Sequence, residues 1–167
     1  SNNGLTSLDG CPKTVTGDFN CSRNSLTSLF EGPTEVGDFD CSFNQLKNLS
    51  YAPKEVKGNF DCSNNLIDSI KGMPRTIKGF FKCSSNKIAT LKGGPKYVDA
   101  SFDCSENLIE RLIGGPVSVG QDYFCSKNNL TDLDGVADEI GWDLVTDIRL
   151  NHLTSTFNEE EKTWRYK

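Results

Sequence analysis

The sequence predicts a solenoid of stacked turns whose regular structure is mostly short parallel β-strands, and three observations lead to this fold class. Six of the seven cysteines recur at intervals of 20 or 21 residues. All six prolines keep the same register, eight or nine residues before those cysteines. The stretch F-x-C-S-x-N, with tyrosine as its first residue in the last copy, alternates apolar and polar residues with the period of two that is typical of a strand. A tandem repeat with one strand per unit stacks into a coil with a parallel sheet.

The strand is the first element of each unit, and its aromatic residue and cysteine are expected to point into the core. Residues one unit apart lie in neighbouring strands about 4.8 Å apart, so the cysteines form an inward column. We expect these thiols to be reduced and buried, because in-register neighbours point the same way and a disulfide needs a particular dihedral angle. This favours a reducing compartment. Cys11 lies outside the column and is expected to be reactive. The column consists of Cys21, Cys41, Cys62, Cys83, Cys104 and Cys125.

An asparagine follows each strand, at the point where the chain must turn away from the sheet. Its side-chain amide can donate to and accept from the backbone of adjacent turns, which predicts an asparagine ladder. Two aliphatic positions then return to the core, and glycine and proline shape the next bend. A unit of 21 residues leaves no room for a long helix. The back of each turn is therefore expected to be extended or one turn of 3₁₀ helix.

The unit F-x-C-S-x-N-x-L-x-x-L resembles the leucine-rich-repeat signature L-x-L-x-x-N-x-L-x-x-L, with phenylalanine and cysteine in two leucine places. The resemblance covers residues 5–135, so we expect six tandem repeats in 1–135 and a degenerate seventh repeat with a C-terminal cap in 136–167. The short period is similar to that of the bacterial leucine-rich-repeat class found in secreted effectors. The sequence GDFDCS resembles sequences in repeat proteins of tailed bacteriophages and some bacteria. The spacing of V-x-G-x-F departs from the usual pattern by one residue. The resemblance implies a protein partner on a concave strand face, with no catalytic motif and no cofactor.

Composition argues against several function classes. A net charge of −5 argues against a nucleic-acid partner, which needs clustered lysine and arginine, and favours a protein partner with a basic patch. No apolar run approaches the ~20 residues of a membrane span and no leader opens the chain, so we expect no membrane and a cytoplasmic location, the host cytoplasm for a phage-encoded chain. His152, the only histidine, has no nucleophile in register beside it, and neither C-x-x-C nor a glycine-rich phosphate loop occurs. We therefore expect no enzyme and no metal.

The outward residues of the strands are the positions that the repeat leaves free, and they form the candidate binding site. Two columns of these residues carry six aspartates and one lysine, together with two phenylalanines. An exposed aromatic residue among carboxylates is typical of an interface anchor, and the charges can steer a basic partner. Phe43 is expected at the edge of this surface. The predicted partner-binding residues are Asp18, Asp38, Asp40, Asp61, Phe80, Lys82, Asp103, Asp122 and Phe124.

Two other interpretations of the aspartates stay open. A solvated sheet face needs polar side chains in any case, and stacked carboxylates can bridge a divalent cation, although Asn59 and Lys82 interrupt their columns. The column that follows each proline is basic and lies opposite the strands. We expect little contribution to binding from this column, which consists of Lys13, Thr34, Lys54, Arg75, Lys96 and Val117.

The two ends of the coil differ. Residues 136–167 lose the proline, cysteine and serine columns, and Asn158 with Glu161 resembles a capping box. This pattern predicts a short capping helix over 159–166, with Trp164 in the lid. The first repeat shows no such lid, which favours truncation or an interface there. A second function class is therefore a structural repeat that self-associates end to end through its N-terminal turn, or a fragment of a larger structural protein.

Overall fold

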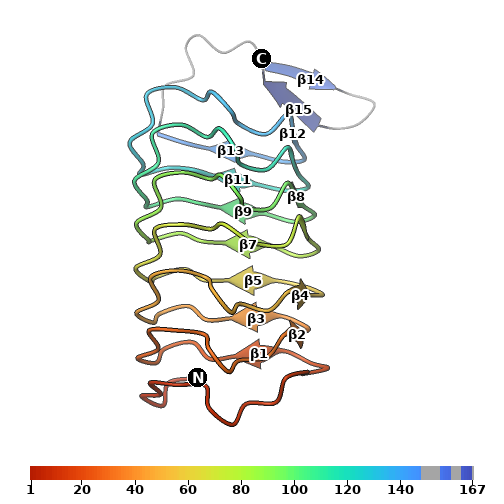
Figure 1. Cartoon of the computed structure of the whole chain (residues 1–167). Coiled ribbons are helices and arrows are strands. Elements are labelled where there is room, and N and C mark those ends of the chain that lie inside the picture. The colour runs from red at the N-terminus through yellow and green to blue at the C-terminus, as the bar shows by residue number, and fades with distance from the viewer. Residues whose placement is uncertain (148–154, 159–162, 167) are drawn as a thin grey trace.

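The computed structural model of the chain describes residues 1–147, 155–158 and 163–166. These residues form a parallel β-solenoid of ~6 turns with a ~21-residue period, stacked one above another (Figure 1). The N-terminus lies at one end of the stack, and the last two strands lie at the other (Figure 1). The predicted parallel repeat solenoid is therefore confirmed, although most units contain two short strands where one was expected.

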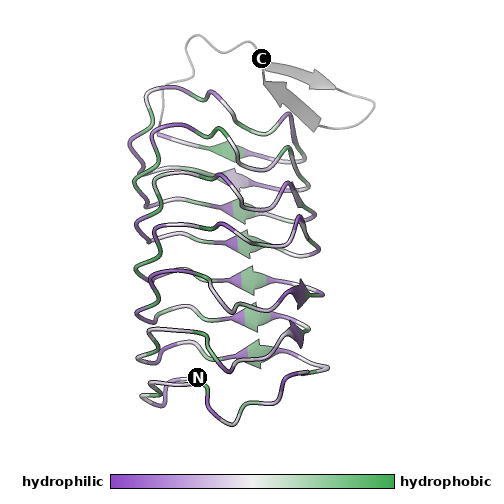
Figure 2. Cartoon of the chain, in the orientation of Figure 1, coloured by the Kyte–Doolittle hydropathy of each residue, from purple (hydrophilic) through white to green (hydrophobic). Residues whose placement is uncertain are grey.

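Two-residue strands one repeat length apart form a seven-stranded parallel main sheet. The strands pair aromatic residue to aromatic residue, as in Phe39↔Phe60 and Phe60↔Phe81, because one repeat length separates the partners. Figure 2 shows a hydrophobic first residue and a hydrophilic second residue in the first five of these strands. The main-sheet strands are β1 (Phe19–Asn20), β3 (Phe39–Asp40), β5 (Phe60–Asp61), β7 (Phe81–Lys82), β9 (Phe102–Asp103), β11 (Tyr123–Phe124) and β13 (Leu144–Val145).

A second set of short strands forms the back of the coil, which is extended as expected. Two strands pair in the first turns, and four more pair in the later turns. A C-terminal hairpin extends the later sheet. The first pair is β2 (Glu35–Val36) and β4 (Glu55–Val56); the later strands are β6 (Thr76–Ile77), β8 (Tyr97–Val98), β10 (Ser118–Val119) and β12 (Glu139–Ile140), and the hairpin is β14 (Ser155–Asn158) with β15 (Thr163–Tyr166).

The predicted capping helix over 159–166 is wrong where the structure describes it. Residues 163–166 form β15, which pairs antiparallel with β14 and with Ile140 of β12. The open edge of β12 presents unpaired backbone groups, and a strand satisfies them whereas a helix cannot. Residues 159–162 and His152 lie outside the described part of the chain. The part that is described contains no helix long and apolar enough to cross a membrane.

The core consists of similar layers of side chains, one from each turn, stacked so that equivalent residues form columns. Phenylalanine, cysteine and aliphatic side chains of successive turns are buried on top of one another, with Phe60, Cys62 and Ile67 as one turn's contribution. All seven thiols are free, and the six column thiols are buried. Burial raises the pKa of Cys21 to about 12 and that of Cys125 to about 11, and it raises the pKa of the four thiols between them well above the usual value. The reduced, buried cysteine column is confirmed.

The asparagine ladder is also present. In the third turn, the Asn65 amide nitrogen donates to the carbonyls of Cys41 (3.1 Å), Cys62 (3.1 Å) and Ser63 (3.2 Å). Its oxygen accepts from the backbone nitrogen of Leu46 at 3.0 Å. One side chain thus joins its own turn to the preceding one, and this arrangement recurs in the other central turns.

Candidate functional site

The outward side of the main sheet, here called the strand face, carries the candidate site. It consists of the second residue of each main-sheet strand and the residue just before each strand. Two hollows open on this face, and eight of the nine predicted partner-binding residues line one or both of them. Asp122 lines neither hollow.

The larger hollow has a volume of about 490 Å³ and lies over β5, β7, β9, β11 and β13. Its strand residues include Lys82, Asp103 and Phe124, and Phe80 stands just before β7. The side chains after the strands supply a polar rim. The residues that line it are Asp61, Phe80, Phe81, Lys82, Ala100, Ser101, Asp103, Ser105, Glu106, Gln121, Phe124, Ser126, Lys127 and Val145.

The smaller hollow has a volume of about 270 Å³ and lies over β1, β3 and β5. Its lining contains four aspartates and no lysine or arginine. Asp61 and Phe80 line both hollows, so the two are continuous across the strand face. The lining residues are Asp18, Phe19, Asn20, Asp38, Phe39, Asp40, Asn59, Asp61 and Phe80.

The aspartates within the strands have a structural role that the sequence did not reveal. Asp40 Oδ1 accepts from the backbone nitrogen of Ser42 at 3.0 Å and from its hydroxyl at 2.7 Å. Asp103 makes the same pair of bonds with Ser105. Asn20 makes them with Ser22 through its amide oxygen, so a neutral acceptor can replace the carboxylate there. This contact gives the serine after the cysteine a partner in these three turns, whereas Lys82 and Phe124 occupy the acceptor position in two later turns.

The residues just before the strands form a second ladder in the first turns. Asp18 Oδ1 accepts from the backbone nitrogen of Asp38 at 2.9 Å, and Asp38 Oδ1 accepts from that of Asn59 at 2.8 Å. Asn59 Oδ1 in turn accepts from the backbone nitrogen of Phe80 at 2.9 Å. Each bond ties one turn to the next, so these side chains hold the stack together as well as facing outward.

Glycine accompanies this ladder because the capping side chain occupies the space that a side chain would need. A Cβ at Gly58 would collide with the Asp38 carboxylate, and one at Gly79 would collide with both the side chain and the backbone of Asn59. Phe80 offers no side-chain acceptor, and the glycine position of the following turn is Ala100. The ladder is therefore interrupted where the larger hollow begins, and one longer bond of the same kind recurs at Asp122, whose Oδ1 accepts from the backbone nitrogen of Asp143 at 3.2 Å.

The apolar side chains of the larger hollow are partly exposed. Phe80 is 36% exposed and Val145 39% exposed, and Phe124 is half-buried. Phe43, expected at the edge of this surface, lines neither hollow; the Arg23 guanidinium lies over its ring, 4.2 Å from the centroid. The aromatic part of the surface therefore rests on Phe80 and Phe124, with Val145 added by the structure.

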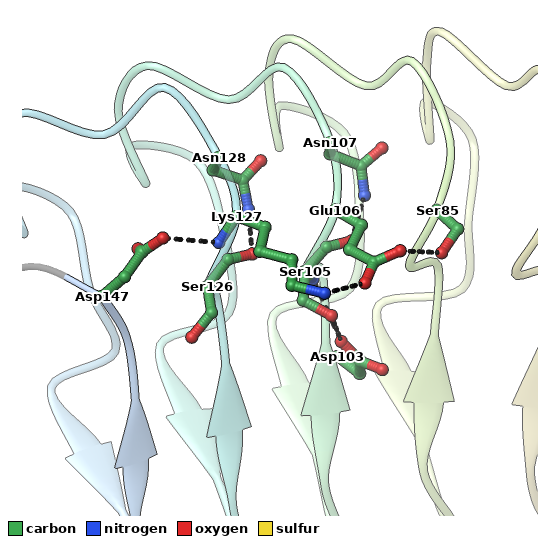
Figure 3. A network of polar contacts seen from close by, with 9 residues as sticks. All are labelled: Ser85, Asp103, Ser105, Glu106, Asn107, Ser126, Lys127, Asn128 and Asp147. Atoms are coloured by element: carbon green, nitrogen blue, oxygen red, sulfur yellow. Dashed lines mark hydrogen bonds and ion pairs between the residues drawn. The ribbon is translucent and has the colours of Figure 1, made fainter.

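One rim of the larger hollow is a polar network (Figure 3). Glu106 accepts from the Ser85 hydroxyl at 2.8 Å and pairs with the Lys127 ammonium at 2.6 Å. These contacts lower the pKa of Glu106, with Lys127 as the largest cause, and raise that of Lys127. Asp147 accepts from the backbone nitrogen of Lys127 at 2.9 Å. Glu106 (φ 55°) and Lys127 (φ 55°) occupy the position between serine and asparagine in their units, and both have left-handed backbone conformations. The residue type at this position changes from unit to unit, and this variation was the sequence signal that could have identified them.

The structure also gives evidence on the cation-binding alternative and on the basic column that follows the prolines. Within residues 1–147 and the two described hairpin strands, no group of three or more histidine, cysteine, aspartate or glutamate side chains is arranged to hold a metal ion. On the back of the coil, part of the basic column is engaged internally, since Lys13 pairs with Glu31 at 2.6 Å and Lys96 donates to the carbonyls of Gly114 and Gly115.

Comparison of the chain with protein-family models, with curated proteins and with solved structures gives no match. The geometry of the strand face is therefore the basis for assigning a function.

Proposed function

We propose that this chain is a non-enzymatic protein-binding module of the leucine-rich-repeat type, which binds a basic protein partner on its strand face. The observation that carries the proposal is the larger hollow, where the exposed Phe80 and Val145 and the half-buried Phe124 line one cavity on an otherwise polar face. A solvated sheet face needs no aromatic residues, whereas protein interfaces use them as anchors.

Charge supports a basic partner. The outward columns of the strand face carry the six predicted aspartates and only one lysine, Lys82, and the whole chain has a net charge of −5. Carboxylates around an apolar anchor raise the association rate of a cationic partner and lower that of an anionic one. The structural role of the aspartates is compatible with this, because Oδ1 caps a turn while a carboxylate keeps further lone pairs.

The proposed setting is a host cytoplasm. Seven free thiols, six of them buried in one column, suit a reducing compartment. The resemblance of the repeat sequence to proteins of tailed bacteriophages supports a phage-encoded protein that acts on a host protein.

A structural or assembly role is the second candidate, and one observation favours it. At β1, the edge of the main sheet, Val15 and Phe19 are only partly buried, whereas Val36 and Phe39 in the next turn are fully buried. A further coil turn stacked on β1 would cover them. Sedimentation velocity distinguishes this candidate, since end-to-end stacking produces concentration-dependent oligomers that Phe19→Asp disrupts.

Selection from a random peptide display library tests the proposed function. We expect the protein to enrich peptides that combine basic with aromatic or aliphatic residues, and Phe80→Ser with Phe124→Ser to abolish their binding. The matched control is Tyr97→Ser on β8, because Tyr97 is 40% exposed but lies on the back of the coil. Peptides that lose binding to the Tyr97→Ser variant, yet bind the double strand-face variant normally, would overturn the assignment.

A further inference from the structure

We infer that the strand face holds one extended peptide segment across its strands, with a basic part over β1 to β5 and an apolar part over β7 to β13. This inference rests on the proposed function and specifies the partner chemistry and its placement. The structure divides the face into two unlike halves that meet at Asp61 and Phe80.

The half over β1 to β5 suits cationic side chains. Asp18, Asp38, Asp40 and Asp61 line the smaller hollow, with no cationic residue in the lining. In Asp18 and Asp61, the hydrogen bond to the backbone uses one of the two carboxylate oxygens. An ionised carboxylate has about four lone-pair sites, so acceptor capacity remains for an ammonium or guanidinium group.

The half over β7 to β13 suits apolar side chains. Phe80, Phe124 and Val145 line the larger hollow, and Ala100 adds a methyl group between them in sequence. Lys82 lies in register between Asp61 and Asp103, so it offsets the charge of its two neighbours. The attraction for a cation is therefore concentrated in the first half.

Continuity of the hollows sets the length of the segment. From Asp40 in β3 to Phe124 in β11 the chain crosses four steps of the main sheet, β3 to β5, β7, β9 and β11. At about 4.8 Å per step this distance is roughly 19 Å. An extended peptide advances about 3.3 Å per residue, so about six residues separate the basic from the apolar contacts.

Polar side chains along the hollow can serve the peptide backbone. Ser101 and Gln121 lie on the rim before the strands, and Ser126 lies on the rim after them. An extended backbone laid across the strands presents N–H and C=O groups that need partners. These side chains offer both donors and acceptors.

The test uses a fluorescein-labelled peptide with two arginines, a Gly-Ser spacer of about four residues and two phenylalanines, measured by fluorescence anisotropy. Asp40→Asn with Asp61→Asn removes charge from the basic half but keeps the turn acceptor, as Asn20 does in the first turn. We expect this double variant to weaken binding about fivefold at low salt, and less at high salt. Phe124→Ser should weaken it about tenfold or more at both salt concentrations.

Two further peptides test the spacing and the charge. A peptide without the spacer should bind about as weakly as one in which the arginines are replaced by glutamine, because neither reaches both halves at once. The inference is overturned if the strand face binds these peptides as tightly as the designed one, or if the Asp40→Asn, Asp61→Asn variant binds normally. The proposed function itself fails in a different way, when Phe80→Ser and Phe124→Ser leave the binding of every peptide unchanged.

Discussion

The two halves of the strand face are built differently although the same core lies beneath them. From Asp18 to Asn59, each residue before a strand caps the backbone of the next turn, and glycine leaves room for that cap. From Phe80 onward the face instead contains an apolar hollow, and the glycine position becomes Ala100, Gln121 and Trp142. The comparison indicates that the residues before the strands in the first half are constrained by hydrogen bonds that stabilise the stack. Those of the second half are less constrained, so apolar side chains can stand there as binding anchors.

The largest effect that we expect concerns the core shared by both halves. An unfolded thiol releases its proton near pH 8.5, whereas burial raises the pKa of Cys125 to about 11, that of Cys21 to about 12, and that of the thiols between them well above the usual value. Unfolding therefore releases protons at high pH, so the stabilisation is complete below about pH 8.5 and is lost as the pH rises towards the raised pKa values. Between pH 8 and 10 the free energy of unfolding should fall by about 2 kcal/mol per buried thiol.

Urea unfolding at several pH values checks this expectation. Cys83→Ala removes one titrating thiol and should make the fall with pH shallower by one proton. Because the column runs through both halves, circular dichroism and tryptophan fluorescence should report one transition. A free energy of unfolding that stays constant from pH 8 to 10, or two separate transitions, would contradict the shared core.

The next effect should appear in the first half alone. In Gly79→Ala the new Cβ meets the Asn59 side chain and, at 2.8 Å, the Asn59 backbone nitrogen, which cannot move aside. We expect a loss of about 2 kcal/mol in the free energy of unfolding. The reverse change in the second half, Ala100→Gly, should cost only about 0.5–1 kcal/mol through backbone entropy. Equal effects of the two variants in thermal or urea unfolding would erase the distinction between the halves.

A smaller difference should separate two aspartates of the same column. Asp38 accepts from both the backbone nitrogen and the side-chain amide of Asn59, so Asp38→Ala should cost about 1–2 kcal/mol. Asp122 accepts a single longer bond of 3.2 Å from the exposed Asp143, so Asp122→Ala should cost a few tenths of a kcal/mol. Urea unfolding midpoints of the two variants measure the difference, and the reverse order would show that the ladder does not support the first half.

The smallest expected effect lies beneath the second half. Tyr123 takes the place of phenylalanine in its column, and its buried hydroxyl lies beside the Cys104 thiol without a hydrogen bond of ordinary geometry. Tyr123→Phe should therefore leave the free energy of unfolding unchanged or raise it by up to about 1 kcal/mol. Phe102→Tyr, which buries a second hydroxyl, is the matched control and should lower it by about 1–3 kcal/mol. A clear destabilisation by Tyr123→Phe in calorimetry would reveal a role for that hydroxyl.

The interior was predictable because every turn repeats it. Cysteine, phenylalanine and asparagine recur at a fixed spacing, and in a stacked coil that spacing alone brings Asn65 against the carbonyl of Cys41. The C-terminal hairpin was not predictable from Asn158 and Glu161, because a local capping pattern does not reveal the open edge of β12 that β15 pairs with.

The strand face was predictable in position but not in detail. The alternation of the strands placed eight of the nine predicted residues at the hollows. The structural task of Asp38 depends on Gly58 in the next turn, a pairing that becomes visible only when the turns are stacked. Glu106 and Lys127 were missed because they follow the strands, where the alternation of residues no longer predicts direction. Their left-handed backbone conformation places both of them on the lining of the same hollow.

The central claim is that the strand face is the binding surface, with its apolar second half as the anchor, and amide chemical-shift mapping tests it most directly. The nitrogen-15-labelled protein is titrated with the designed basic and aromatic peptide. We expect the largest shifts at the amides of Phe80, Asp103 and Phe124, with smaller shifts at Asp40 and Asp61. Shifts centred instead on the back strands, at Glu55, Thr76 and Tyr97, would contradict the account.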